Sequence, residues 1–160
     1  MNENQSEKRM LEKAAIELFI CSFKEIFGVE YKVVCYQERP DAILEDPEGN
    51  RLGMEVTHLF YDELKAKILL GKSNSTGHKT ESFYKYLDVL NDLLDKKAKT
   101  GLNYPIGYPC SLLIRDTSPV WTKEDFEEAN SLIKLPQKVY KDIWLLTQDK
   151  ISIWSLFKID

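Results

Sequence analysis

Residues 39–57 read Arg-Pro-Asp-Ala-Ile-Leu-Glu-Asp-Pro-Glu-Gly-Asn-Arg-Leu-Gly-Met-Glu-Val-Thr, a pattern that indicates two β-strands joined by a turn. Pro40 cannot donate to a strand ladder, so it belongs at the start of a strand, and an apolar run follows shortly after it. Residues 46–50 combine Pro and Gly in one short polar cluster, which is typical of a turn. The sequence therefore predicts a β-hairpin with strands at about residues 41–46 and 52–58.

Two carboxylates occupy matching places in this hairpin. Asp41 opens the first strand, and Glu55 lies inside the apolar run of the second. A buried carboxylate is costly unless a metal, a cation or dedicated hydrogen bonds compensate it. Because side chains alternate faces along a strand and both acids lie at similar distances from the turn, we expect Asp41 and Glu55 to lie across from each other or diagonally on one face.

This acidic pair favours a divalent-metal site. The ordinary alternative stays open, because an antiparallel sheet often carries polar residues on one face and an Asp after Pro is common in turns.

Chain length, composition and net charge limit the class of protein. The chain has 160 residues, of which 43% are hydrophobic, so we expect one domain, residues 1–160, with a core of its own. The net charge of −4 provides no global positive field for a nucleic-acid backbone, although it leaves room for a local basic patch.

The N-terminal sequence and the cysteines indicate the cellular compartment. The polar N-terminus lacks the apolar core of a signal peptide, and no apolar run is long enough to span a membrane. Cys21, Cys35 and Cys110 lie in apolar helix or strand contexts without CxxC spacing, so we expect buried free thiols. These observations predict a cytoplasmic protein with no membrane partner.

Periodicity and turn residues predict the other elements. We expect helices at residues 6–27, 61–70, 80–99 and about 122–133, a loop at 71–77, and strands at 31–37, 110–115, 142–147 and 151–157, the last two joined by a turn at 148–150.

The order of these elements predicts the fold class. An α-β-β-β-α-β core followed by a further helix and hairpin gives an α/β (α+β) fold, with a central mixed sheet flanked by helices. The strand at residues 110–115 follows a helical crossover, so we expect it to run parallel to a hairpin strand.

Helical phase adds one acid to the candidate site. Residues advance about 100° each along a helix, which places Glu12 inside the apolar arc of the first helix and Glu17 on the opposite side. An acid on the buried face near a helix start is unusual. The alternative is a residue at the edge of the buried face that is favoured by the positive end of the helix dipole.

The residues Pro40-Asp41, a spacer of thirteen residues, and Glu55-Val56-Thr57 resemble the motif of the PD-(D/E)XK nuclease superfamily. The resemblance covers roughly residues 10–116, including the helix before the motif and the helix and strand after it. It implies a restriction-endonuclease-like core and a Mg²⁺- or Mn²⁺-dependent nuclease that hydrolyses phosphodiester bonds of DNA or RNA.

The resemblance also implies roles for individual residues. Asp41 and Glu55 would be catalytic residues and metal ligands, and the backbone carbonyl of Val56 would be a further ligand. Members of the superfamily often contribute a helix glutamate, and Glu12 is the candidate here.

The chain departs from the motif at Thr57, where the superfamily has a lysine. Lys97 continues the buried stripe of the helix at residues 80–99, and Lys79 shares its phase, so either can supply the missing cation. We prefer Lys97 as the catalytic lysine. The alternative is that both lysines only extend along apolar surface or favour the helix dipole.

Two functions from different classes therefore remain open. The first is the metal-dependent nuclease. The second is a catalytically inactive nuclease-fold module that binds a protein or nucleic-acid partner, as the acidic net charge and Thr57 suggest. The sequence leaves open the choice between DNA and RNA and the oligomeric state, with a homodimer as one option.

Overall fold

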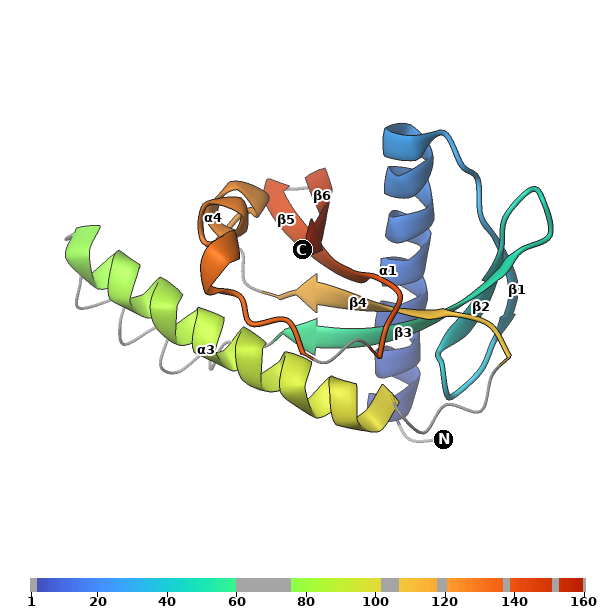
Figure 1. Cartoon of the computed structure of the whole chain (residues 1–160), viewed down its shortest axis with the longest axis horizontal. Helices are drawn as coiled ribbons and strands as arrows, with labels where there is room; N and C mark the ends of the chain where they lie inside the picture. Colours follow the sequence, from blue (N-terminus) through green and yellow to red (C-terminus); the bar gives the residue numbers. More distant parts are fainter. Residues whose placement is uncertain are drawn as a thin grey trace.

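A computed structural model of the chain describes residues 3–59, 76–101, 107–117, 121–136, 139–150 and 153–159 (Figure 1). Its elements are, in chain order, α1 (Glu3–Phe27), β1 (Lys32–Tyr36), β2 (Ala42–Glu45), β3 (Arg51–Leu59), α3 (Thr76–Gly101), β4 (Cys110–Asp116), α4 (Lys123–Glu128), the 3₁₀ helix η1 (Asn130–Leu132), β5 (Ile143–Lys150) and β6 (Ile153–Ile159).

The strands form one six-stranded mixed sheet in the order β1-β2-β3-β4-β5-β6. The pairs β1–β2, β2–β3 and β5–β6 are antiparallel, whereas β3–β4 and β4–β5 are parallel. The α/β fold, the order of the α-β-β-β-α-β core and the parallel pairing of the strand after the crossover are thus confirmed. Parallel strands need a crossover between them, and α3 lies in the connection from β3 to β4.

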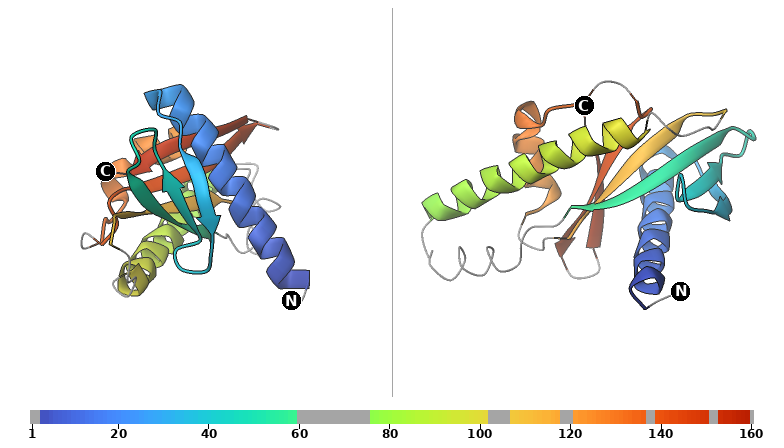
Figure 2. Two further views of the ribbon diagram at one scale, coloured as in Figure 1. Left: turned by 90° about the vertical axis from the view of Figure 1, so that its right-hand side faces the viewer. Right: turned by 90° about the horizontal axis from the view of Figure 1, so that it is seen from below.

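Helices cover both faces of the sheet, α1 on one and α3 and α4 on the other (Figures 1 and 2). Alternation along β4 shows the division, because Leu112 and Ile114 pack in the core beneath α3 and α4, while Leu113 packs in the core beneath α1. Met54 and Val56 of β3 belong to the α1 core. Every second residue of β3, including Glu55 and Thr57, therefore faces α3.

Several boundaries differ from the sequence predictions. β5 continues through residues 148–150, where we predicted a turn, because Gln148 and Lys150 still pair with β6 across a register shift. Thr76 and Gly77 belong to α3 rather than to a loop. The predicted helix at 122–133 divides into α4 and η1. The predicted helix at 61–70 and loop residues 71–75 lie outside the described residues.

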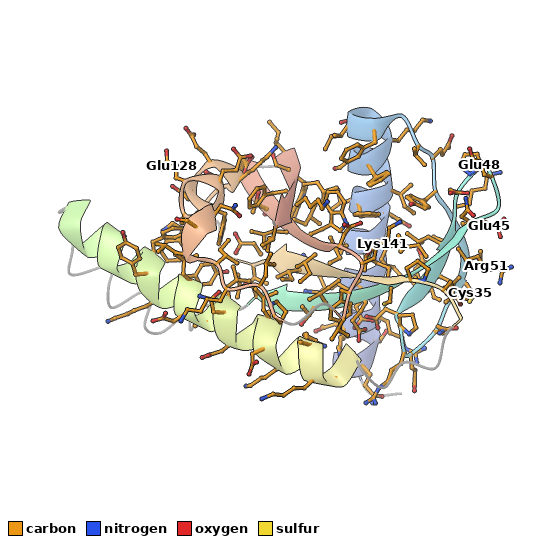
Figure 3. All side chains as sticks on the ribbon, in the orientation of Figure 1. Cys35, Glu45, Glu48, Arg51, Glu128 and Lys141 are labelled. Atoms are coloured by element: carbon orange, nitrogen blue, oxygen red, sulfur yellow. The ribbon has the colours of Figure 1, made fainter. Side chains whose placement is uncertain are left out.

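The cysteines are free, as predicted, but the prediction of burial is right only for Cys110. Cys21 and Cys35 are exposed. Cys35 lies in β1, the outer strand of the sheet (Figure 3), most of whose residues are exposed. Within the described residues, no helix has both the length and the apolar character needed to cross a membrane.

The docking of α1 depends on Phe19, which is fully buried and meets the ring of Trp144 edge-on at 5.7 Å between centroids. We expect Phe19→Ala to lower the free energy of unfolding by about 3–5 kcal/mol, because it removes a large ring from a packed core. Urea denaturation followed by tryptophan fluorescence measures this loss. Leu11→Ala, at a position 40% exposed on the same helix, is the control and should change it by about 0.5 kcal/mol or less.

Candidate metal centre

The hairpin register brings Asp41 and Glu55 together. The paired residues of β2 and β3 run from Glu45 opposite Arg51 to Ala42 opposite Met54. One further step in the same register sets Asp41 opposite Glu55. Asp41 itself lies just before β2 rather than at its first position, which corrects the predicted strand start by one residue.

The carboxylate of Asp41 lies at the end of β2, in line with the sheet. The backbone N–H of Val56 donates to Asp41 Oδ2 at 2.7 Å. The neighbouring N–H groups of β3 point the other way, since the N–H of Gly53 donates to the carbonyl of Pro109 beside β4. The amide of Val56 thus points to the side where β2 has ended, and the side chain of Asp41 takes the place of the missing strand partner.

Glu55 approaches this carboxyl from the α3 face of the sheet. Its side chain is buried, with 6% of the residue exposed, and it forms a hydrogen bond with Asp41. Cys110 and Tyr140 lie close enough that the charge of Glu55 contributes to raising the pKa of each, although burial is the larger cause. Glu55 is therefore enclosed by apolar neighbours and bonded to a second acid.

Glu12 approaches the same carboxyl from α1, on the opposite face. Only 13% of its side chain is exposed, which confirms the predicted position on the buried arc of the helix. Burial raises the pKa of Glu12, and the charge of Asp41 and a hydrogen bond with it raise that pKa further. The carboxyls of Glu12, Asp41 and Glu55 thus form a hydrogen-bonded series through the gap at the end of β2.

The electrostatics of this series are unfavourable to full ionisation. Burial raises the pKa of Asp41 from 3.8 to about 8, and the hydrogen bond and the charge of Glu55 act in the same direction. The Val56 amide and the charge of Lys97 lower that pKa, but they do not offset the increase. At neutral pH the raised pKa keeps Asp41 largely protonated.

The donors are of the kind that Mg²⁺ and Mn²⁺ prefer. Asp41, Glu55 and Glu12 offer carboxylate oxygens, which suit hard divalent cations, and two facing acids gain most from a positive charge between them. The carbonyl of Val56 points to the same side as its N–H, because both groups of one strand residue face the same neighbour. In the described part of the chain, no group of three or more His, Cys, Asp or Glu side chains is already arranged to hold a metal ion.

Lys97, the lysine preferred from the sequence, lies in the helix that covers the Glu55 side of the sheet. Lys97 of α3 is partly buried, and its charge lowers the pKa of Asp41. Its backbone carbonyl accepts a hydrogen bond from the Tyr140 hydroxyl at 2.9 Å, which fixes this turn of α3. Thr57 is buried on the Glu55 side of β3. The side chain of Lys79 lies outside the described residues, so Lys79 stays a prediction.

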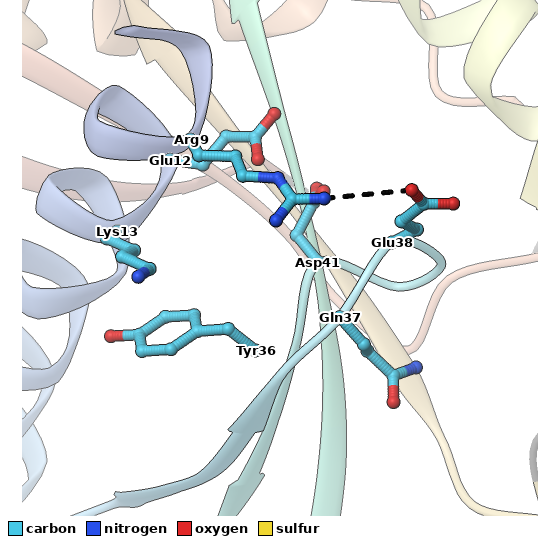
Figure 4. A pocket seen from close by; sticks show the side chains of 7 residues that line it. All are labelled: Arg9, Glu12, Lys13, Tyr36, Gln37, Glu38 and Asp41. Carbon is cyan, nitrogen blue, oxygen red and sulfur yellow. Dashed lines mark ion pairs between the residues drawn. The ribbon is translucent and has the colours of Figure 1, made fainter. Parts of the chain in front are cut away.

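A cavity of about 470 Å³ opens beside Asp41, between α1 and the connection from β1 to β2 (Figure 4). Of its lining, sequence reasoning identified Glu12 and Asp41 and missed the rest, which consists of Arg9, Lys13, Tyr36, Gln37 and Glu38. One signal was available, since basic residues at positions 8, 9 and 13 surround Glu12 in the sequence.

Comparisons with protein-family models, with curated proteins and with solved structures found no match to this chain. The likeness to PD-(D/E)XK nucleases therefore depends on the motif residues and on the order of the elements.

The raised pKa of Asp41 gives a pH-dependent stability. Between pH 4 and 8 the folded state keeps a proton that the unfolded state releases, so the wild-type free energy of unfolding falls as pH rises and then levels off above about pH 8. Asp41→Asn keeps an acceptor for Val56 and removes the ionisation. In EDTA, we expect the stability of this variant relative to wild type to rise by about 4 kcal/mol between pH 5 and 9, because wild type loses about 1.4 kcal/mol per pH unit up to about pH 8.

Thermal unfolding across that pH range measures the difference, with Asp46→Asn as the control. Hydrogen bonds in the turn lower the pKa of Asp46, so its loss should destabilise the protein at pH values above the ordinary aspartate pKa, the opposite sign. If the difference in stability between Asp41→Asn and wild type stays constant with pH, the raised pKa does not belong to Asp41.

Proposed function

We propose that the protein is a Mg²⁺- or Mn²⁺-dependent nuclease of the PD-(D/E)XK type that hydrolyses phosphodiester bonds of DNA or RNA. The observation that carries this proposal is the position of Asp41, bonded to the Val56 amide and flanked by Glu55 and Glu12. Asp41 thus interacts with acids of two other elements, Glu55 of β3 and Glu12 of α1, beside an open cavity.

Each residue of the site would have a distinct role. Asp41 and Glu55 would hold the cation through carboxylate oxygens, with the Val56 carbonyl and Glu12 as further ligands. A bound divalent ion supplies a more acidic water molecule and stabilises charge on the phosphate. The buried surroundings of Glu55 exclude bulk water and keep its carboxylate oriented toward Asp41.

Lys97 would supply the positive charge that the motif lysine supplies elsewhere. It approaches from α3, on the sheet face that Glu55 and Thr57 also occupy. An ammonium group positioned there would stabilise negative charge that develops on the phosphate, an interaction that gains strength in a site shielded from water.

A second candidate function is a non-catalytic module that uses the same fold to bind a partner. Two observations favour it: Thr57 cannot provide a charge, and the raised pKa of Asp41, which is hydrogen-bonded to Glu55, keeps this carboxyl protonated at neutral pH. Under this alternative the acidic series is a structural feature at the end of β2.

Cleavage assays with Mn²⁺ separate the two functions. We expect wild-type protein to nick DNA or RNA, EDTA to abolish the nicking, and Asp41→Ala or Glu55→Ala to reduce the rate at least ~10³-fold, because each removes an oxygen ligand. Glu45→Gln is the control, since Glu45 is a carboxylate of the same hairpin that pairs with Arg51 away from the site. If wild type does not cleave and calorimetry detects no Mn²⁺ binding, the enzyme proposal fails and the binding module remains.

The role of Lys97 has its own test. Lys97→Met keeps the apolar stem and removes the charge, and we expect kcat to fall by about 10²–10³-fold with little change in KM. Lys96→Met, at the exposed neighbouring position of α3, should leave kcat unchanged. A loss of thermal stability without a loss of kcat would mean that Lys97 has only a structural role.

A further inference from the structure

The cavity beside Asp41 has a basic rim, although the chain as a whole is acidic. Lys8, Arg9 and Lys13 of α1 and Arg39 of the β1–β2 connection line this depression, which continues past the 470 Å³ cavity along the helix. The chain carries a net charge of −4, and the same lining also holds the carboxyls of Glu12, Glu38 and Asp41, so these cations lie among acidic groups. Four cations gathered at one place can still contact a phosphate backbone when they exchange those carboxylates for phosphates.

These cations are held loosely and can exchange partners. Lys8 pairs with Glu12 at 3.8 Å, and Arg9 pairs with Glu38 at 3.7 Å, and the basic side chains of the two pairs are 69% and 54% exposed. Exposed ion pairs contribute little to stability, so the cost of replacing a carboxylate by a phosphate is small. Figure 4 shows Arg9 extending from α1 toward Glu38 of the β1–β2 connection.

An aromatic ring forms one wall of the same cavity. Tyr36, the last residue of β1, is 39% exposed, and the ammonium of Lys13 lies 5.0 Å from its ring centroid (Figure 4). The Lys13 ammonium covers one face of this ring, so a base that stacks there displaces Lys13 toward a phosphate. An aromatic ring beside basic side chains is the combination that binds single-stranded nucleic acids, in which bases stack on aromatic groups and cations follow the backbone.

The volume of the cavity favours a single-stranded nucleic acid over a duplex as its ligand. A volume of about 470 Å³ is in the range of pockets that enclose one small organic molecule, so it holds one nucleotide. The bases of a duplex are stacked on one another and present only their edges in the grooves. They therefore offer no free face to Tyr36.

We propose that the substrate is a single-stranded nucleic acid, with one nucleotide seated in the cavity, its base stacked on Tyr36 and its flanking phosphates on Arg9 and Lys13. This inference rests on the proposed function, since it places the adjoining phosphodiester beside Asp41 and Glu12. It specifies that the substrate is single-stranded and names the residues that would bind it.

Binding is measured apart from cleavage, in EDTA and with the Glu55→Gln variant, because Glu55 does not line the cavity. The probes are a fluorescein-labelled oligothymidylate of about 12 nucleotides and a duplex of the same length. We expect anisotropy titrations to give at least tenfold tighter binding of the single strand. Equal or tighter binding of the duplex overturns the proposal, as does the absence of binding to either probe.

Variants in this background test the two contacts separately. Tyr36→Leu should weaken single-strand binding by about tenfold, and Tyr36→Phe should retain it. Tyr84→Leu, at a 50% exposed tyrosine of α3, is the matched control and should have no effect. If the Tyr36→Leu variant binds as tightly as the Tyr84→Leu control, the stacking assignment is wrong.

The basic contacts are read from the salt dependence. Arg9→Gln and Lys13→Gln should each reduce the slope of log K against log salt by about 0.7, whereas Lys24→Gln should not change it. Lys24 is a suitable control because it lies on α1 and pairs with Glu30, as Arg9 pairs with Glu38, but far from the cavity.

The outcomes distinguish this inference from the proposed nuclease. Wild-type cleavage with Mn²⁺ that is insensitive to Tyr36→Leu leaves the nuclease in place and overturns the single-strand inference. Selective single-strand binding without cleavage supports this inference and rejects the enzyme.

Discussion

The structure of the site depends on one unsatisfied strand edge. β2 ends opposite Met54, so the amide of Val56, two residues further along β3, has no strand partner on that side. A backbone N–H at such a buried place needs an acceptor, and the carboxylate of Asp41 provides it at 2.7 Å. This single bond holds an acid in line with the sheet. Acids from both faces reach it there, Glu55 from the side of α3 and Glu12 from α1.

The same gap explains why the acids and the cavity adjoin. Where β2 continues, a strand separates the two faces of the sheet, and groups beneath α1 cannot meet groups beneath α3. Beyond Ala42 that barrier is missing, so the charge of Lys97 from α3 acts on the Asp41 carboxyl, which also lines the depression beside α1. Early termination of a strand thus joins two otherwise separate environments, one enclosed and one open to solvent.

The hairpin, the pairing of Asp41 with Glu55 and the inward phase of Glu12 were predictable because each follows from local spacing. Two-residue alternation and a turn fix which positions of β2 and β3 oppose each other, and a period of 3.6 fixes the buried arc of α1. The cavity was not predictable, because it needs the distance between α1 and the β1–β2 connection, which no local pattern contains. The exposure of Cys21 and Cys35 was missed for the same reason: an apolar neighbourhood in sequence does not show whether a helix covers it.

The place of Thr57 follows from the two-face arrangement. A lysine at that position would extend on the α3 face, the face from which Lys97 lowers the pKa of Asp41. The physical requirement is a positive charge near two buried carboxyls, and it does not depend on which element carries that charge. A lysine on β3 would have to stay within the packed core beneath α3, whereas a partly buried residue of α3 can reach the acids from the helix surface. Under the proposed function, a cation supplied by Lys97 of α3 leaves position 57 free for a small, buried threonine.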